Sequence, residues 1–134
     1  MKKDPLRIQA HVILGTLILQ YLLGMFVNLF VEFPDTTNER TLWKFVGDQI
    51  SVTTHMVIAF LLVIGGIVLL VRSILRKDRQ WIISSSVGLF GLLAATFAGV
   101  RFIPTQQDGY SYIMAIAFII AFVSYGWGIY KRGK

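Results

Sequence analysis

The sequence predicts an all-α membrane protein: an up-down bundle of four transmembrane helices, with both termini in the cytoplasm (N-in/C-in). Of its 134 residues, 55% are hydrophobic and 15% are charged. The hydrophobic residues form four blocks, each close to the roughly 20 residues that cross a bilayer as a helix. Two of the connections are short, which makes neighbouring helices antiparallel. This composition excludes a disordered chain, and the absence of cysteine excludes a disulfide-stapled domain and a Cys-ligated metal module.

The four blocks span residues 8–31, 52–71, 81–103 and 110–130, within a single transmembrane domain of residues 1–134. A segment in lipid must satisfy its own backbone hydrogen bonds, so blocks of this length are expected to be helices. The three prolines agree with these limits, because a missing N–H costs little at the edge of a helix. They are Pro5, Pro34 and Pro104.

The longest connection is the outer loop of residues 32–49. Its segment 41–46 has the apolar pattern of a short interfacial helix that lies on the bundle. Such a helix either covers an outer pocket as a lid or only anchors the loop.

The charge distribution predicts the orientation. Ten of the 13 basic residues lie in segments 1–7, 72–79 and 131–134, whereas Arg40, Lys44 and Arg101 lie on the other side. By the positive-inside rule, both termini are cytoplasmic, as in a multi-pass protein of a bacterial inner membrane. The net charge of +6 therefore reflects topology. It predicts attraction to anionic membrane lipid and no nucleic-acid partner, because the basic residues are divided among three short segments.

The third block carries small residues at a spacing of three to four, which places most of them on one helix face. In lipid, small residues promote helix association by allowing close approach. This face either packs within the bundle or binds a partner membrane subunit or a second copy in a homodimer. Its residues are Gly88, Gly91, Ala95, Ala98 and Gly99.

The second and fourth blocks resemble each other. Residues Met56–Phe60 align with Met114–Phe118, and both segments enter the membrane from the outside. The similarity predicts a parallel repeat in which helices 1–2 and 3–4 are related by an axis along the membrane normal. The alternative is chance, because these apolar residues are common in membrane helices.

Polar residues inside the membrane are costly, and they are therefore candidates for function. The candidates include His11, Gln20 and Asn28 in the first block and His55 in the second. No Asp, Glu or Lys lies deep in a block. This argues against a proton-coupled antiporter and against a site for a hard cation.

Depth in the membrane decides which residues can share a cofactor. His11 and His55 lie near opposite boundaries, about 20 Å apart along the normal, so they cannot ligate one iron. Met114 lies at nearly the depth of His55, and a His–Met pair is a known haem arrangement. We therefore predict that His55 and Met114 ligate one b-type haem, with Arg101 holding a propionate.

Each of these residues also has a structural interpretation. His55 can hydrogen-bond a neighbouring helix, and Met114 can fill core space. Arg101 can pair with an acidic residue on the outer face. For His11, we expect an interfacial side chain that extends to water.

Several short motifs follow one another in a recognisable order: Gly24, Phe33-Pro34-Asp35, His55 and Gly99-Val100-Arg101. This order resembles one four-helix half of the haem A synthase fold, and also small four-helix bacterial membrane proteins of the same layout. The resemblance implies haem ligation by His55. The chain departs from the pattern in its fourth block, which has no histidine and carries Ile113 and Met114 instead.

The leading functional prediction is a cofactor-binding membrane module that takes part in electron transfer or haem handling. One alternative is a non-enzymatic accessory or assembly subunit of a larger membrane complex. Another is a small homo-oligomeric transporter with Gln20, Asn28 and Ser84–Ser86 facing the pore. No nucleotide-binding loop, metalloprotease motif or nucleophile elbow occurs, so any enzymatic role would require a cofactor, a partner subunit or a lipid-phase substrate.

Overall fold

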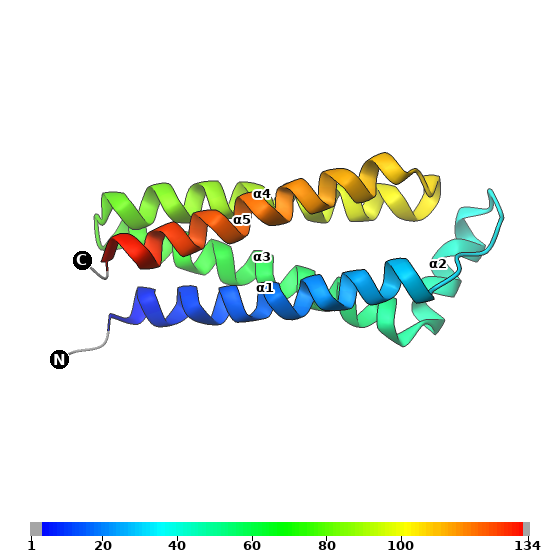
Figure 1. The fold of residues 1–134 in the computed structure, drawn as a ribbon, viewed down its shortest axis with the longest axis horizontal. Helices are drawn as coiled ribbons and strands as arrows, with labels where there is room; N and C mark the ends of the chain where they lie inside the picture. The colour runs from blue at the N-terminus through cyan, green and yellow to red at the C-terminus, as the bar shows by residue number, and fades with distance from the viewer. Residues whose placement is uncertain (1–3, 133–134) are drawn as a thin grey trace.

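The computed structural model describes residues 4–132 and contains five helices, of which four long ones form an antiparallel bundle (Figure 1). The helices are α1 (Pro5–Phe30), α2 (Glu39–Asp48), α3 (Ile50–Leu75), α4 (Arg79–Thr105) and α5 (Asp108–Arg132). The four long helices are long and apolar enough to cross a membrane. The predicted all-α bundle of four membrane-spanning helices is therefore confirmed, and the chain is a multi-pass membrane protein.

Two of the long helices, α1 and α4, begin before the hydrophobic blocks because a polar side chain caps each of them. The side chain of Asp4 accepts a hydrogen bond from the N–H of Leu6 at 3.1 Å, with Pro5 in the first turn. Asp78 caps α4 in the same way through the N–H of Trp81 at 3.3 Å. A hydropathy pattern finds only the apolar part of a helix, so the predicted limits stop short of these caps.

The end of α4 also differs from the prediction. Pro104 lies inside the last turn of the helix, not beyond its end. The helix ends at Thr105, and the next residue, Gln106, caps it in the left-handed conformation with φ 49°. The side-chain Nε2 of Gln106 donates to the carbonyl of Pro34 at 3.1 Å, which ties the outer loop to this corner of the bundle.

Around the bundle, α3 packs between α1 and α4, and α5 packs between α4 and α1. The pairs α1/α4 and α3/α5 therefore lie on the diagonals. The termini lie together at one end, which we call the terminal end, and α2 lies at the other, which we call the α2 end (Figure 1).

The closest helix pair is α4–α5, where glycines of α4 face α5. A Cβ atom at Gly91 would lie 2.8 Å from the backbone oxygen of Ala117 and 2.9 Å from the backbone nitrogen of Ala121. Gly88 faces the ring of Tyr125. For Gly88 and Gly91, the structure thus shows the intramolecular alternative. Docking of a partner on the small-residue face of α4 stays a prediction.

Polar side chains join the helices of each pair near the terminal end. Ser84 and Ser124 bond reciprocally, because the Oγ of each donates to the carbonyl of the other at 2.6 and 2.7 Å. In the other pair, the Nε2 of Gln9 donates to the carbonyl of Gly65 at 3.0 Å, and its Oε1 accepts from the Nη1 of Arg72 at 2.8 Å. These bonds satisfy polar groups that lipid could not satisfy.

The contacts support the predicted repeat and give its register. Adding 75 to a residue number in α1 gives its counterpart in α4, and adding 59 to a number in α3 gives its counterpart in α5. Gln9 then corresponds to Ser84, and Gly65 to Ser124. The hydrogen bond from Gln9 to the carbonyl of Gly65 therefore has its equivalent in the bond from Ser84 to the carbonyl of Ser124. The displacement of 75 also relates the buried residues of α1 to buried residues of α4: Leu6, Ala10, Ile13 and Leu17 correspond to Trp81, Ser85, Gly88 and Leu92. In this register Met114 corresponds to His55. The alignment from sequence paired Met114 with Met56, so it differs from the structural register by one residue.

The short helix α2 covers the α2 end of the bundle. Its residues Leu42 and Val46 are buried against Val52 of α3 and Ile103 of α4. The predicted helix over 41–46 is thus present and extends over Glu39–Asp48. Since its apolar face packs on two membrane-spanning helices, α2 anchors the outer loop to the bundle.

Candidate functional site

His55 lies in the α2 half of the bundle, at the seam between α3 and α1. The Nε2 of Gln20 donates to the backbone carbonyl of His55 at 3.0 Å and lies 3.3 Å from the Nε2 of its ring. One turn further along α1, a Cβ atom at Gly24 would lie 2.9 Å from the ring Cε1 of His55. Glycine therefore allows the imidazole to lie directly against α1. We call these three residues the His55 site.

Two polar atoms of the His55 site are buried without a hydrogen-bond partner within the described part of the chain: the Oε1 of Gln20 and the Nδ1 of His55. The side chain of Gln20 is only 9% exposed. Because the amide of Gln20 donates toward Nε2 of the ring, we assign the imidazole proton to Nδ1. The site thus holds an unpartnered donor and an unpartnered acceptor in an apolar bundle, where such groups are costly and mark candidates for function.

Met114 occupies the equivalent position in the other helix pair. A Cβ atom at Gly99 of α4 would lie 3.2 Å from the Sδ of Met114. The displacements that relate the two halves carry Gly24 to Gly99 and His55 to Met114, so both side chains lie against a glycine of their own helix pair. An axis along the bundle would place equivalent residues at equal depth, and the depth of Met114 relative to His55 stays a prediction.

The other predicted residues lie apart from the His55 site. His11 is exposed, and its Nδ1 lies 2.7 Å from the carbonyl of Arg7. It precedes Gln20 by nine residues, about 13 Å along the helix. Asn28 and Arg101 are exposed as well. Within residues 4–132, the side chain of Arg101 forms no ion pair, and the pair that does form joins Arg76 and Asp4 at 3.1 Å.

The sequence did not reveal the partnership of Gln20 and Gly24 with His55. Gln20 and Gly24 are four residues apart, so they lie one above the other on the same face of a helix. That spacing was the available signal, but it does not say which neighbouring helix the face meets.

The donor set limits which metal the chain can hold by itself. Residues 4–132 contain no cluster of three His, Cys, Asp or Glu side chains that could hold a metal ion. A haem needs only one or two protein ligands, because the porphyrin supplies the other four nitrogens. Comparisons of the chain with family models, curated proteins and solved structures found no match. The candidate site is therefore assigned from its contacts.

Replacing Gln20 by methionine tests whether its amide holds His55. We expect Gln20→Met to lower the free energy of unfolding in detergent by about 1 kcal/mol, because hydrogen bonds between membrane helices contribute about that much. The matched control is Asn28→Met, since Asn28 is an exposed amide on the same helix. Equal stability of the two variants, measured by denaturant titration with circular dichroism, would contradict a structural role for Gln20.

Proposed function

We propose that the chain is an integral membrane module that binds a b-type haem through His55 and serves electron transfer or haem handling. The observation that carries this proposal is the His55 site, where a buried imidazole whose Nδ1–H has no partner in the described chain lies inside an apolar bundle; its other nitrogen, Nε2, would be the ligand. The resemblance of the chain's motif order to one half of the haem A synthase fold also supports His55 as the haem ligand.

The second ligand in this proposal is Met114. The repeat register supports this choice, because it equates Met114 with His55 on the diagonally opposite helix, and His–Met coordination is known in haem proteins. Both side chains would have to turn from Gly24 and Gly99 toward the bundle axis, and Gln20 would have to release the ring nitrogen. When bound, the haem would supply one-electron chemistry. Arg101, which has no ion-pair partner in the described chain, would bind a propionate.

The arrangement of the other polar side chains argues against a transport path through one copy of the bundle, while a pore between copies, the homo-oligomeric alternative, stays a prediction. Of the groups predicted to face a pore, Ser84 is bonded to Ser124, and Ser85 donates to the carbonyl of Trp81. Asn28 and Ser86 are exposed. These groups therefore do not line one common path through a single copy of the bundle.

The first test is an absorbance spectrum of the purified protein after expression with an ample supply of haem. We expect a Soret band, and a dithionite-minus-oxidised difference spectrum with the sharp α-band of a six-coordinate b-type haem. A colourless, folded protein under these conditions would overturn the proposal.

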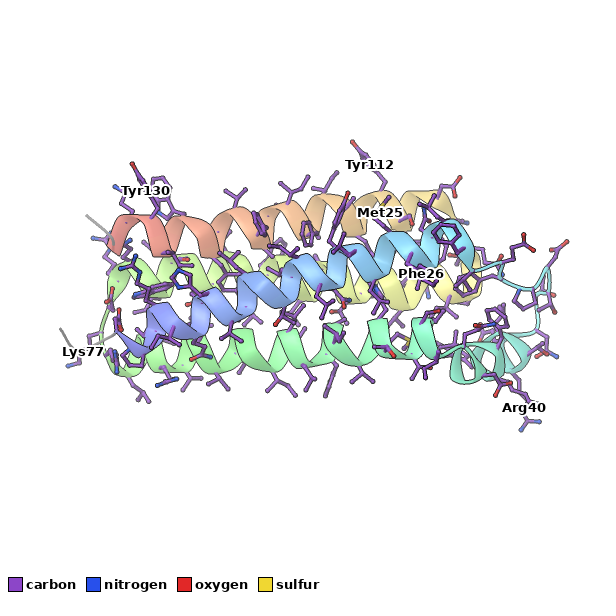
Figure 2. The ribbon with its side chains drawn as sticks, turned by 60° about the horizontal axis from the view of Figure 1, so that its bottom comes forward. Met25, Phe26, Arg40, Lys77, Tyr112 and Tyr130 are labelled. Atoms are coloured by element: carbon purple, nitrogen blue, oxygen red, sulfur yellow. The ribbon has the colours of Figure 1, made fainter. Side chains whose placement is uncertain are left out.

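We also propose that the terminal end faces the cytoplasm of a bacterial cell, with α2 outside. The support is the positive-inside rule, because ten of the 13 basic residues lie in sequence segments 1–7, 72–79 and 131–134. Arg40 and Lys77 are exposed at opposite ends of the bundle (Figure 2). Since the chain has no cysteine, Arg40→Cys and Lys77→Cys each introduce a unique thiol.

The two cysteine variants give an all-or-none prediction. A membrane-impermeant maleimide is expected to label Arg40→Cys in intact spheroplasts and to label Lys77→Cys only after the membrane is permeabilised. Labelling in the reverse order would show the opposite orientation.

A further inference from the structure

An apolar groove lies on the outer surface of the α4–α5 pair, away from the His55 site. It is lined by Val87, Ile119, Ile120, Val123, Ser124 and Trp127. The lining residues of α5 extend from Ile119 to Trp127, about 12 Å along the helix. The groove therefore follows the bundle axis and ends at Trp127, close to the terminal end.

The lining of this groove fits a hydrocarbon chain. Ser124 is its one hydroxyl residue, and the Oγ of Ser124 already donates to the carbonyl of Ser84 at 2.7 Å. Val123 and Ile119 are 61% and 58% exposed, so this apolar surface is open. Apart from the indole N–H of Trp127 at one end, the lining offers no free polar side chain to an occupant with polar groups along its length.

A cation marks the terminal end of the groove. The Nζ of Lys131 lies 5.0 Å from the ring centroid of Trp127, within the range of a cation–π contact. Lys131 follows Trp127 by one helical turn, so its ammonium lies just beyond the apolar lining. Asp4, an acidic residue at the same end, pairs with Arg76. Lys131 forms no ion pair within residues 4–132.

We propose that this groove binds one acyl chain of an anionic phospholipid, with the lipid phosphate at Lys131. The apolar lining matches the chain, and the charge of Lys131 matches the phosphate. A tryptophan beside a lysine is also typical of the headgroup level of a membrane. The charge favours lipid over a second copy of the chain, because a symmetric contact through the groove would bring two ammonium groups together.

The fluorescence of Trp127 reports on the occupant directly. The protein is placed in nanodiscs of phosphatidylcholine that contain a minor fraction of a lipid with brominated acyl chains, either phosphatidylglycerol or phosphatidylcholine. Subtracting the signal of a Trp127→Phe variant isolates Trp127 from Trp43 and Trp81. We expect brominated phosphatidylglycerol to quench Trp127 at an about fivefold lower mole fraction than brominated phosphatidylcholine, the preference that one lysine near the surface provides.

Two charge variants and one groove variant complete the test. Lys131→Gln is expected to abolish the preference for phosphatidylglycerol, and Lys77→Gln, which removes an exposed charge at the same end, is expected to keep it. Val123→Phe, which fills the groove, is expected to weaken quenching by the anionic lipid.

Three results would overturn the proposal: equal quenching of the wild type by both lipids, an unchanged preference in Lys131→Gln, or a dimer that shields Trp127 from both lipids. Each readout is independent of haem binding.

Discussion

Replacing Gly91 by alanine is expected to lower the free energy of unfolding by about 1–3 kcal/mol, the usual cost of overpacking, although alanine is the better helix former. The added Cβ would lie 2.8 Å from the backbone oxygen of Ala117 and 2.9 Å from the backbone nitrogen of Ala121. A backbone cannot turn aside as a flexible side chain can. The α4–α5 pair must therefore separate to admit the methyl group, and it loses contacts along the seam.

The matched control is Gly126→Ala on α5. A Cβ atom there would have no neighbour within 4 Å, so we expect this variant to gain up to about 1 kcal/mol from its better helix propensity. Unfolding of both variants in detergent micelles, followed by circular dichroism during denaturant titration, gives the comparison. Equal stability of Gly91→Ala and Gly126→Ala would contradict the close packing of α4 against α5 at Gly91.

Replacing His55 by alanine is expected to abolish the Soret absorbance of the haem-loaded protein. His55 is the one histidine ligand in the proposed site. Without it, the thioether of Met114 is too weak a ligand to retain the haem iron by itself. The effect is all or none in the spectrum. The variant should remain folded, because an alanine at position 55 creates no overlap with Gly24.

The chain provides the control in its other histidine. His11 is exposed and bonds to the carbonyl of Arg7, far along α1 from the His55 site. His11→Ala should therefore bind haem at the level of the wild type. Absorbance per protein, with circular dichroism to verify the helical content, decides the result. Equal absorbance in His55→Ala and wild type, or loss in both histidine variants, would exclude His55 as the specific ligand.

The fold was predictable because lipid imposes a strong pattern on the sequence. A helix that crosses the membrane must be apolar over most of its length, so hydropathy alone located all four spans. Hydropathy placed the starts of α1 and α4 too late, because the residues that cap them, Asp4 and Asp78, are polar. The amphipathic segment around Leu42 and Val46 was also recognisable, since its apolar residues share one helix face.

The sequence predicts the depth of the candidate residues but not which helices they contact. Counting residues from the helix ends predicts Met114 at the level of His55, and this common depth stays a prediction. Which face of α1 meets α3 depends on the rotation of both helices, and hydropathy that is apolar all round does not fix rotation. Gln20 therefore entered the prediction as an isolated polar residue, although the structure joins it to His55. The register of the repeat could be determined only from the contacts between helices. A short apolar segment aligns almost equally well when it is shifted by one residue.

The two halves of the repeat differ in how much adjustment they permit. At Gly91 the helices meet backbone to backbone, whereas a Cβ atom at Gly65 in the α1–α3 seam would lie 3.7 Å from the nearest atom of Ile13. Tightly packed interiors resist deformation, so α4–α5 forms a stiff platform. Any rearrangement around His55 then falls on the α1–α3 seam, where the long side chains of Gln9 and Gln20 on α1 can change rotamer without forcing the backbones apart.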